Sequence, residues 1–210
     1  MKSYKYYFYK IKRFIFGNYV DKDNLINFYN HFNYDRIIVF DTETTGLDIE
    51  NDDIIQIAGV EIKNGKIGNS IMFFLFTDRL KKYKQVHNIS QKIIDTNGVK
   101  PKYGLSEFLE FIKDDPIVAH NIKFDFNMLN SNLKRVGLKP IFKNKLFCSL
   151  KMTRQVFPKL KSYKLQNILN TLKVEGVNSH DALDDTKATV NLLFKLSENI
   201  EKKFIDKKGV

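Results

Sequence analysis

Residues 37–46 read Ile-Ile-Val-Phe-Asp-Thr-Glu-Thr-Thr-Gly, so four apolar residues lead directly into two acids. Such an apolar run, rich in β-branched residues, is typical of a central strand buried on both faces. Side chains alternate along a strand, so Asp41 and Glu43 share one face at its end. These carboxylates repel each other unless cations lie between them, and two divalent metal ions about 3.5–4 Å apart would fit. A strand that ends in solvent is the alternative.

The composition indicates a globular protein of one moderate domain, with 210 residues of which 43% are hydrophobic and 28% charged. The single cysteine, Cys148, excludes an internal disulfide and fits the reducing cytoplasm, where we expect the protein. No apolar run reaches the roughly 18 residues of a transmembrane helix. Residues 1–17 are basic and aromatic, and Lys10, Lys12 and Arg13 interrupt them too often for a signal peptide.

The net charge of +11 is concentrated in one part of the chain, which we call the acid-free segment, between Asp125 and Glu175. Its eleven basic residues are Lys134, Arg135, Lys139, Lys143, Lys145, Lys151, Arg154, Lys159, Lys161, Lys164 and Lys173. Taking these eleven from the 35 basic residues leaves 24, which balance the 24 acidic ones. Such a segment favours a polyanionic partner, nucleic acid first. A lysine-rich surface from biased composition is the alternative.

Hydrophobic periodicity predicts the order of the secondary structure elements. Strands are expected over about 36–42, 54–62, 71–76, 116–119 and 145–149, with an Asn-Gly hairpin turn within 63–66. Helices are expected over 21–32, within 86–100, over 105–112, 126–136, 150–156 and 164–172, and from Asp181 onwards. This order predicts an α/β fold in which a mixed sheet of about five strands is flanked by helices.

Two of the predicted helices carry an acid where a core-facing apolar residue is expected. The apolar stripe within 129–136 extends back one turn to Asp125, and the stripe within 189–196 extends back to Asp185. Both acids lie near helix N-termini, where the helix dipole favours negative charge. A capping role suits Asp181, but Asp185 projects with the core face and therefore needs a partner, such as a metal ion.

Asp41, Glu43, Asp125 and Asp185 converge if both helix N-termini point at the end of the first strand, where sites of α/β sheets form. Four oxygen ligands suit two Mg²⁺ or Mn²⁺ ions better than zinc. Such a pair can hold a phosphodiester, activate a water and stabilise the leaving oxygen. His180, five residues before Asp185, adds a base that titrates near neutral pH, although a lone histidine is often structural.

Three segments in this order resemble the motifs of the DEDDh, or DnaQ-like, 3′–5′ exonucleases, which include the proofreading epsilon subunit of bacterial DNA polymerase III. They are Asp-Thr-Glu-Thr-Thr-Gly-Leu at 41–47, Ala-His-Asn-Ile-Lys-Phe-Asp at 119–125 and His-Asp-Ala-Leu-Asp-Asp at 180–185. The resemblance spans about 35–200. Residues 86–90 resemble a further family segment, with Asn88 where the family has glycine.

The resemblance implies a ribonuclease H-like fold and a metal-dependent 3′–5′ exonuclease that releases nucleoside 5′-monophosphates from DNA, in proofreading or repair. RNA trimming, degradation of short oligonucleotides and a non-catalytic nucleic-acid-binding module are the alternatives. It assigns metal binding to Asp41, Glu43, Asp125 and Asp185 and the general base to His180. It also implies substrate contacts by Leu47 against the terminal base, by the backbone of Thr44 and Thr45, and by Asn121.

The chain is expected to have three parts. Residues 1–34 are expected to form a basic, aromatic and helical extension, residues 35–203 the exonuclease domain, and residues 204–210 a short tail. The expected partner is nucleic acid, single-stranded DNA or 3′ ends first. A DNA polymerase is a further candidate, although the sequence shows no obvious polymerase-binding tail.

Overall fold

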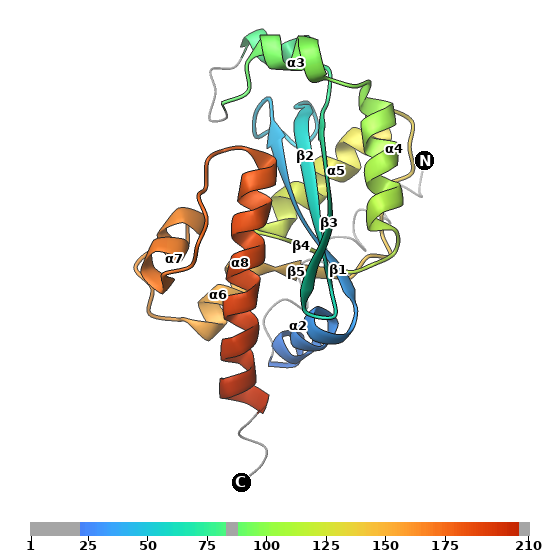
Figure 1. The fold of residues 1–210 in the computed structure, drawn as a ribbon. Coiled ribbons are helices and arrows are strands. Elements are labelled where there is room, and N and C mark those ends of the chain that lie inside the picture. Colours follow the sequence, from blue (N-terminus) through green and yellow to red (C-terminus); the bar gives the residue numbers. More distant parts are fainter. Residues whose placement is uncertain (1–21, 83–87, 206–210) are drawn as a thin grey trace.

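A computed structural model of the protein describes residues 22–82 and 88–205 (Figure 1). Residues 1–21 of the expected helical extension therefore lie outside the described residues, as do His87 and the last five residues of the expected tail. Among the described residues, no helix combines the length and the apolar character needed to span a membrane.

A five-stranded mixed sheet in the order β3-β2-β1-β4-β5 forms the centre of the fold, as predicted. The strands are β1 (Arg36–Thr44), β2 (Ile54–Lys63), β3 (Lys66–Phe74), β4 (Ile117–Ala119) and β5 (Leu146–Cys148). β1 pairs with β2 antiparallel and with β4 parallel, and β4 pairs with β5 parallel. β3 begins earlier than predicted because the turn at Asn64 and Gly65, with φ of 51° and 67°, pairs Lys63 directly with Lys66.

Seven α-helices surround the sheet in the described part of the chain. They are α2 (Lys22–Tyr34), α3 (Gln91–Asn97), α4 (Pro101–Ile112), α5 (Ile122–Arg135), α6 (Ser149–Val156), α7 (Leu165–Leu172) and α8 (Ala182–Ile200). Short helical turns, η1 (Arg79–Lys82) and η2 (Glu201–Ile205), complete the list. The predicted order of elements is confirmed, with differences of a few residues at their ends.

β1 is buried on both faces and separates two hydrophobic cores. Ile37 and Val39 pack in one core with residues of α2, α6, α7 and α8. Ile38 and Phe40 pack in the other with residues of α4 and α5. The four side chains are at most 1% exposed, as expected for a central strand. Alternation along β1 then directs Asp41 and Glu43 to the face covered by α8, and Thr42 to the face covered by α5.

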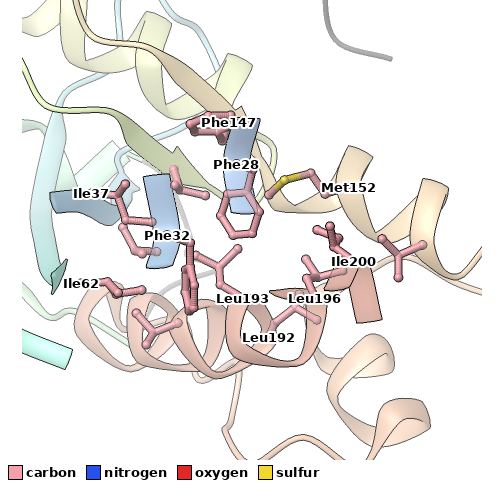
Figure 2. Close-up of a cluster of buried hydrophobic side chains, with 14 of the residues drawn as sticks. Phe28, Phe32, Ile37, Ile62, Phe147, Met152, Leu192, Leu193, Leu196 and Ile200 are labelled. Carbon is pink, nitrogen blue, oxygen red and sulfur yellow. The ribbon is translucent and has the colours of Figure 1, made fainter. Parts of the chain in front are cut away.

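The helix α2 packs within the first of these cores. Phe28 and Phe32 lie against Leu193 of α8 and Ile37 of β1 in Figure 2, and both phenylalanines are at most 2% exposed. Their rings also contact each other, with centroids 5.5 Å apart. The expected boundary at residue 35 therefore does not mark a break in the core, because Leu25, Phe28, Tyr29 and Phe32 of α2 share it with the remainder of the domain.

The topology brings distant parts of the sequence to one edge of the sheet. β1 and β4 run parallel, with Ile38 opposite Ile117 and Val39 opposite Val118, so both strands end at the same edge. Asn121 follows β4 with φ of 79°, a left-handed conformation that asparagine tolerates, and turns the chain into α5. The N-terminus of α5 is thereby placed beside the acids at the end of β1.

Candidate active site

Asp125, in the first turn of α5, is joined to the acids of β1 through the residue between them. The Thr42 hydroxyl donates a hydrogen bond of 2.8 Å to Asp125 Oδ1, and both side chains are buried. Because Thr42 separates Asp41 from Glu43 in sequence, this bond fixes the Asp125 carboxylate next to the end of β1. The second motif, which contains Asp125, therefore lies next to the first, which contains Thr42, as predicted.

Asp185, in the first turn of α8, is held by the loop that precedes this helix. Its Oδ1 accepts a 2.9 Å hydrogen bond from the Ser179 N–H, and its Oδ2 accepts one from the Asn178 amide. His180 follows with φ of 58° and is exposed. Ligand atoms of Glu43, His180 and Asp185 lie within 4.8 Å of one another, so the first and third motifs meet.

Burial raises the pKa of the four carboxyl groups, and for two of them the neighbouring acids raise it further. The pKa of Asp41 is raised well above its ordinary value by burial and by the charges of Asp125, Glu43 and Asp185. Burial, followed by the charges of Asp185 and Asp125, raises the pKa of Glu43 to about 8. Burial also raises the pKa of Asp125 to about 7 and that of Asp185 to about 6. The charge of His180 lowers the pKa of Asp185 and offsets part of this effect, but the pKa of all four carboxyl groups stays raised.

The chemistry of this donor set fits hard divalent cations. All four acids offer oxygen atoms, and bound cations would relieve the repulsion that raises the pKa values of Asp41 and Glu43. Asp185 also retains lone pairs for a cation, since each carboxylate oxygen can accept two bonds. His180 lies close enough to Glu43 and Asp185 to be a ligand itself.

These pKa shifts predict how the stability of the metal-free protein depends on pH. Glu43 keeps its proton up to about pH 8 in the folded state but loses it near its ordinary pKa of 4.5 in the unfolded chain. Between these values the folded state binds more protons, so the free energy of unfolding falls as pH rises. We expect the melting temperature in chelator to fall between about pH 5 and about pH 8.

The Glu43→Gln variant provides the control for this pH dependence, because it removes one titrating group without changing side-chain size. Its melting temperature should decline less steeply than that of the wild type over the same interval. A wild-type melting temperature that rises over the interval, or an identical slope in both proteins, would contradict the assignment of raised pKa values to this cluster.

The structure gives the predicted substrate-binding residues different environments. Leu47 is 83% exposed and Asn121 is exposed, so both side chains are open to a ligand. The Thr44 hydroxyl donates to the Gly46 carbonyl at 2.6 Å. The Thr45 N–H donates to the Asp53 carbonyl at 2.9 Å and its hydroxyl to Asp52 Oδ1, so a contact of its backbone with the substrate stays a prediction. The bulge after Glu43 turns this residue inwards.

His120 of the second motif joins the site to the acid-free segment. Its Nε2 lies 3.1 Å from the Tyr163 carbonyl, and its Nδ1 lies 2.8 Å from the Ser149 hydroxyl. Since a carbonyl only accepts, Nε2 carries the proton and Nδ1 accepts from Ser149. Burial lowers the pKa of His120, with Arg154 adding to the effect, which is consistent with a neutral ring. The loop around Tyr163, with its lysines, is thus held beside the second motif.

Three polar residues that organise the site were not predicted from the sequence, namely Thr42, Gln56 and Asn178. Gln56 could have been identified, because it is the one amide within the apolar run 54–60. The sequence indicates Thr42 less strongly, as a polar residue on the face of β1 that bears Ile38 and Phe40. No sequence feature indicates Asn178, since its contact with Asp185 depends on the path of the loop.

Comparison with known proteins identifies the family. The family RNase_T, described as exonuclease, matches residues 38–193. The DNA polymerase III subunit epsilon of Aquifex aeolicus is 30% identical over 187 residues, which are 85% of this chain and 85% of that protein. The PolC-type DNA polymerase III of Caldanaerobacter subterraneus is 34% identical over 172 residues, which are 79% of this chain but only 12% of that polymerase.

Solved structures show the same fold at lower sequence identity. Escherichia coli exonuclease I, in complex with a dT13 oligonucleotide, matches with a TM-score of 0.71 and 17% identity over 82% of this chain and 43% of that one. Exonuclease X, in complex with 5′-overhanging duplex DNA, matches with a TM-score of 0.57 and 22% identity over 77% of this chain and 91% of that one. The fold and family predicted from the motifs are confirmed. The chain belongs to the DnaQ-like exonuclease family and has its ribonuclease H-like fold.

Proposed function

We propose that this protein is a metal-dependent 3′–5′ exonuclease that hydrolyses DNA and releases nucleoside 5′-monophosphates. The observation that carries the proposal is the meeting of Glu43, His180 and Asp185 within 4.8 Å, beside Asp41 and Asp125. A module that only binds nucleic acid has no use for clustered carboxylates near phosphates. The epsilon and PolC-type relatives are DNA polymerase III proteins, which supports DNA as the substrate.

In this proposal Asp41, Glu43, Asp125 and Asp185 hold two Mg²⁺ or Mn²⁺ ions. When bound, such ions hold the phosphodiester, lower the pKa of a water and stabilise the leaving oxygen. His180 takes the proton from the attacking water at an imidazole nitrogen, and its exposure leaves it accessible to that water. The water oxygen bonds to phosphorus, the bond to the 3′ oxygen breaks, and the terminal nucleotide leaves as a 5′-monophosphate.

The substrate strand is held by residues around this centre. Leu47, which is 83% exposed, supplies an apolar surface for the terminal base. Thr44 ends β1, and Asn121 follows shortly after β4. These two strand ends lie at the same edge of the sheet, where both residues contact the terminal nucleotide. Lys159, Lys161 and Lys164 are exposed on the loop that His120 holds beside the second motif, and they bind backbone phosphates.

Replacing Lys159, Lys161 and Lys164 together by alanine tests the phosphate contacts. KM should rise, and kcat should stay near its wild-type value. The slope of the logarithm of DNA affinity against the logarithm of salt concentration should become smaller by about 2, at about 0.7 for each phosphate contact of a single strand. The measurement is the initial cleavage rate on single-stranded DNA over a salt series. The control variant changes Lys63 and Lys66, which lie beside the opposite end of β1. An unchanged slope in the triple variant would assign these lysines to the solvated surface.

Digestion of labelled strands tests the function itself. DNA labelled at its 5′ end should shorten one nucleotide at a time in the presence of Mg²⁺ and remain intact in chelator. Parallel digestions of single-stranded DNA, mismatched duplex DNA, RNA and short oligonucleotides compare the alternative substrates. Preferred degradation of RNA or of very short strands would replace DNA by those substrates, and binding without cleavage would identify a binding module.

The relatives support a role in proofreading or repair in the cytoplasm. A DNA polymerase is the protein partner that the epsilon and PolC-type relatives suggest, because each is part of DNA polymerase III. The chain aligns with 85% of the epsilon subunit and with 12% of the PolC-type polymerase, and co-purification with a DNA polymerase tests the association.

A further inference from the structure

The loop over residues 178–181 carries His180 from α7 towards α8. His180 has φ of 58°, a conformation that L-residues rarely adopt without support from their surroundings. The loop is exposed at His180 itself. Ser179 in the loop is held by the Asn88 amide, which donates to its carbonyl at 3.0 Å, and by Asp185 Oδ1, which accepts its N–H. The two ends of the loop are held by glutamine side chains.

Gln56 holds the end of the loop that enters α8. It lies on β2 opposite Glu43 of β1, so the two side chains share the face covered by α8, and it is 0% exposed. Its Oε1 accepts a 2.9 Å hydrogen bond from the Ala182 N–H, and its Nε2 donates one of 2.7 Å to Asp181 Oδ2. Only this orientation of the amide satisfies both partners, because the backbone N–H needs an acceptor and the carboxylate needs a donor.

Asp181 transmits this contact to the first turn of α8. Its second oxygen, Oδ1, accepts hydrogen bonds from the N–H groups of Leu183 and Asp184, at 3.0 and 3.2 Å, and so caps the helix. The Asp181 carbonyl accepts the Asp185 N–H at 2.9 Å. Gln56 therefore ties the residue after His180, and the helical turn that carries Asp185, to the strand beside Glu43.

Gln166 holds the other end of the loop. Its Oε1 accepts a 2.8 Å hydrogen bond from the Asn178 N–H, and its Nε2 donates to Asn170 Oδ1 at 2.9 Å, one turn further along α7. The Asn178 side chain in turn donates to Asp185. One end of the His180 loop is thus bonded to α7, and the other to β2.

We propose that Gln56 and Gln166 are positioning residues that hold His180 over the acidic cluster by fixing the two ends of its loop. This inference rests on the proposed role of His180 as the general base. Neither glutamine touches the reacting atoms, so both act through the loop. Misplacement of a catalytic group by about 1 Å can cost about 10²-fold in rate, and this sets the size of the expected effect.

Gln56→Met keeps the length of the side chain and removes both hydrogen bonds. We expect kcat to fall by about 10- to 100-fold, with KM within about twofold of wild type, because the binding surface is unchanged. The matched control is Asn144→Leu. Asn144 is 2% exposed, and its amide donates to the Lys113 and Asp115 carbonyls at 2.8 Å each, at the opposite edge of the sheet. This control should lower the melting temperature but leave kcat unchanged.

Gln166→Met supplies a second variant at a half-buried position, where the fold tolerates the change more readily. It should lower kcat in the same direction as Gln56→Met. Each variant is also combined with His180→Asn, which keeps a residue suited to positive φ and removes the base. If the glutamines act through His180, replacing either of them should lower kcat no further in the His180→Asn variant.

Hydrogen exchange of the metal-free protein provides a readout that does not depend on catalysis. Peptides covering 178–182 should exchange faster in both glutamine variants and at the wild-type rate in Asn144→Leu. Unchanged exchange and kcat in both folded glutamine variants, or a full further loss of kcat in the His180→Asn background, would overturn this inference alone. Failure of the proposed function is recognised separately, because the wild type would then release no nucleotides from labelled DNA. A wild-type kcat in His180→Asn would instead refute only the role of His180 as the general base.

Discussion

Asp41→Ala is expected to reduce cleavage to the limit of detection while the protein stays folded. Asp41 is surrounded by Asp125, Glu43 and Asp185, whose charges act on it directly, so in the proposed mechanism its removal leaves the cation site without a central ligand. In chelator the variant should melt at a higher temperature than wild type. Asp41 is destabilising there because burial and like charge both disfavour its ionised form.

The two effects are measured on the same preparations, by release of nucleotides from labelled DNA and by thermal melts with and without Mg²⁺. Asp41→Asn tests whether these two effects come from the charge of the side chain or from its shape. Glu107 is an exposed acid on α4, and Glu107→Ala controls for the loss of an acid elsewhere. The gain in stability is not expected for Asp185→Ala, because Asp185 also anchors Asn178 and the Ser179 N–H. Cleavage that survives Asp41→Ala would refute the two-metal interpretation.

Loss of the His180 imidazole is expected to lower kcat by about 10²- to 10⁴-fold, the usual contribution of a general base. KM for single-stranded DNA should change little, because the proposed strand contacts lie with Leu47 and the lysines of the acid-free segment. Two variants separate the side chain from the backbone. His180→Ala removes the imidazole, and His180→Asn removes it while retaining a residue that tolerates the observed φ of 58°.

Titration with Mg²⁺ distinguishes a base from a ligand. His180 lies within 4.8 Å of the ligand atoms of Glu43 and Asp185, so geometry alone allows either role. A base cannot be replaced by more metal, so both variants should remain slow at saturating Mg²⁺. Recovery of the wild-type rate by Mg²⁺ alone would reassign His180 as a ligand, and a normal rate at ordinary Mg²⁺ would remove it from the mechanism.

The largest part of the fold followed from local patterns. The apolar run at 37–40 predicted a strand buried on both faces, and each of those side chains is at most 1% exposed. The Asn-Gly pair predicted the hairpin, whose turn has the two positive φ angles that this pair favours. Asp125 and Asp185 were identified because they interrupt apolar stripes, and both are 5% exposed or less. Periodicity and turn chemistry are properties of neighbouring residues, so the sequence alone could determine them.

Other features depended on contacts between residues far apart in the sequence. The Thr42 to Asp125 bond spans 83 positions and the Gln56 to Asp181 bond spans 125, and no local pattern indicates either. The bulge that turns the Thr45 N–H towards Asp53 arises from the pairing of β1 with β2. The inclusion of α2 in the core likewise depends on the position of α8. The sequence by itself thus determined which residues could form the site. The packing of β2, α5, α7 and α8 around β1 decided how those residues are held. Hydrogen bonds between distant segments form only when tertiary packing brings donor and acceptor together.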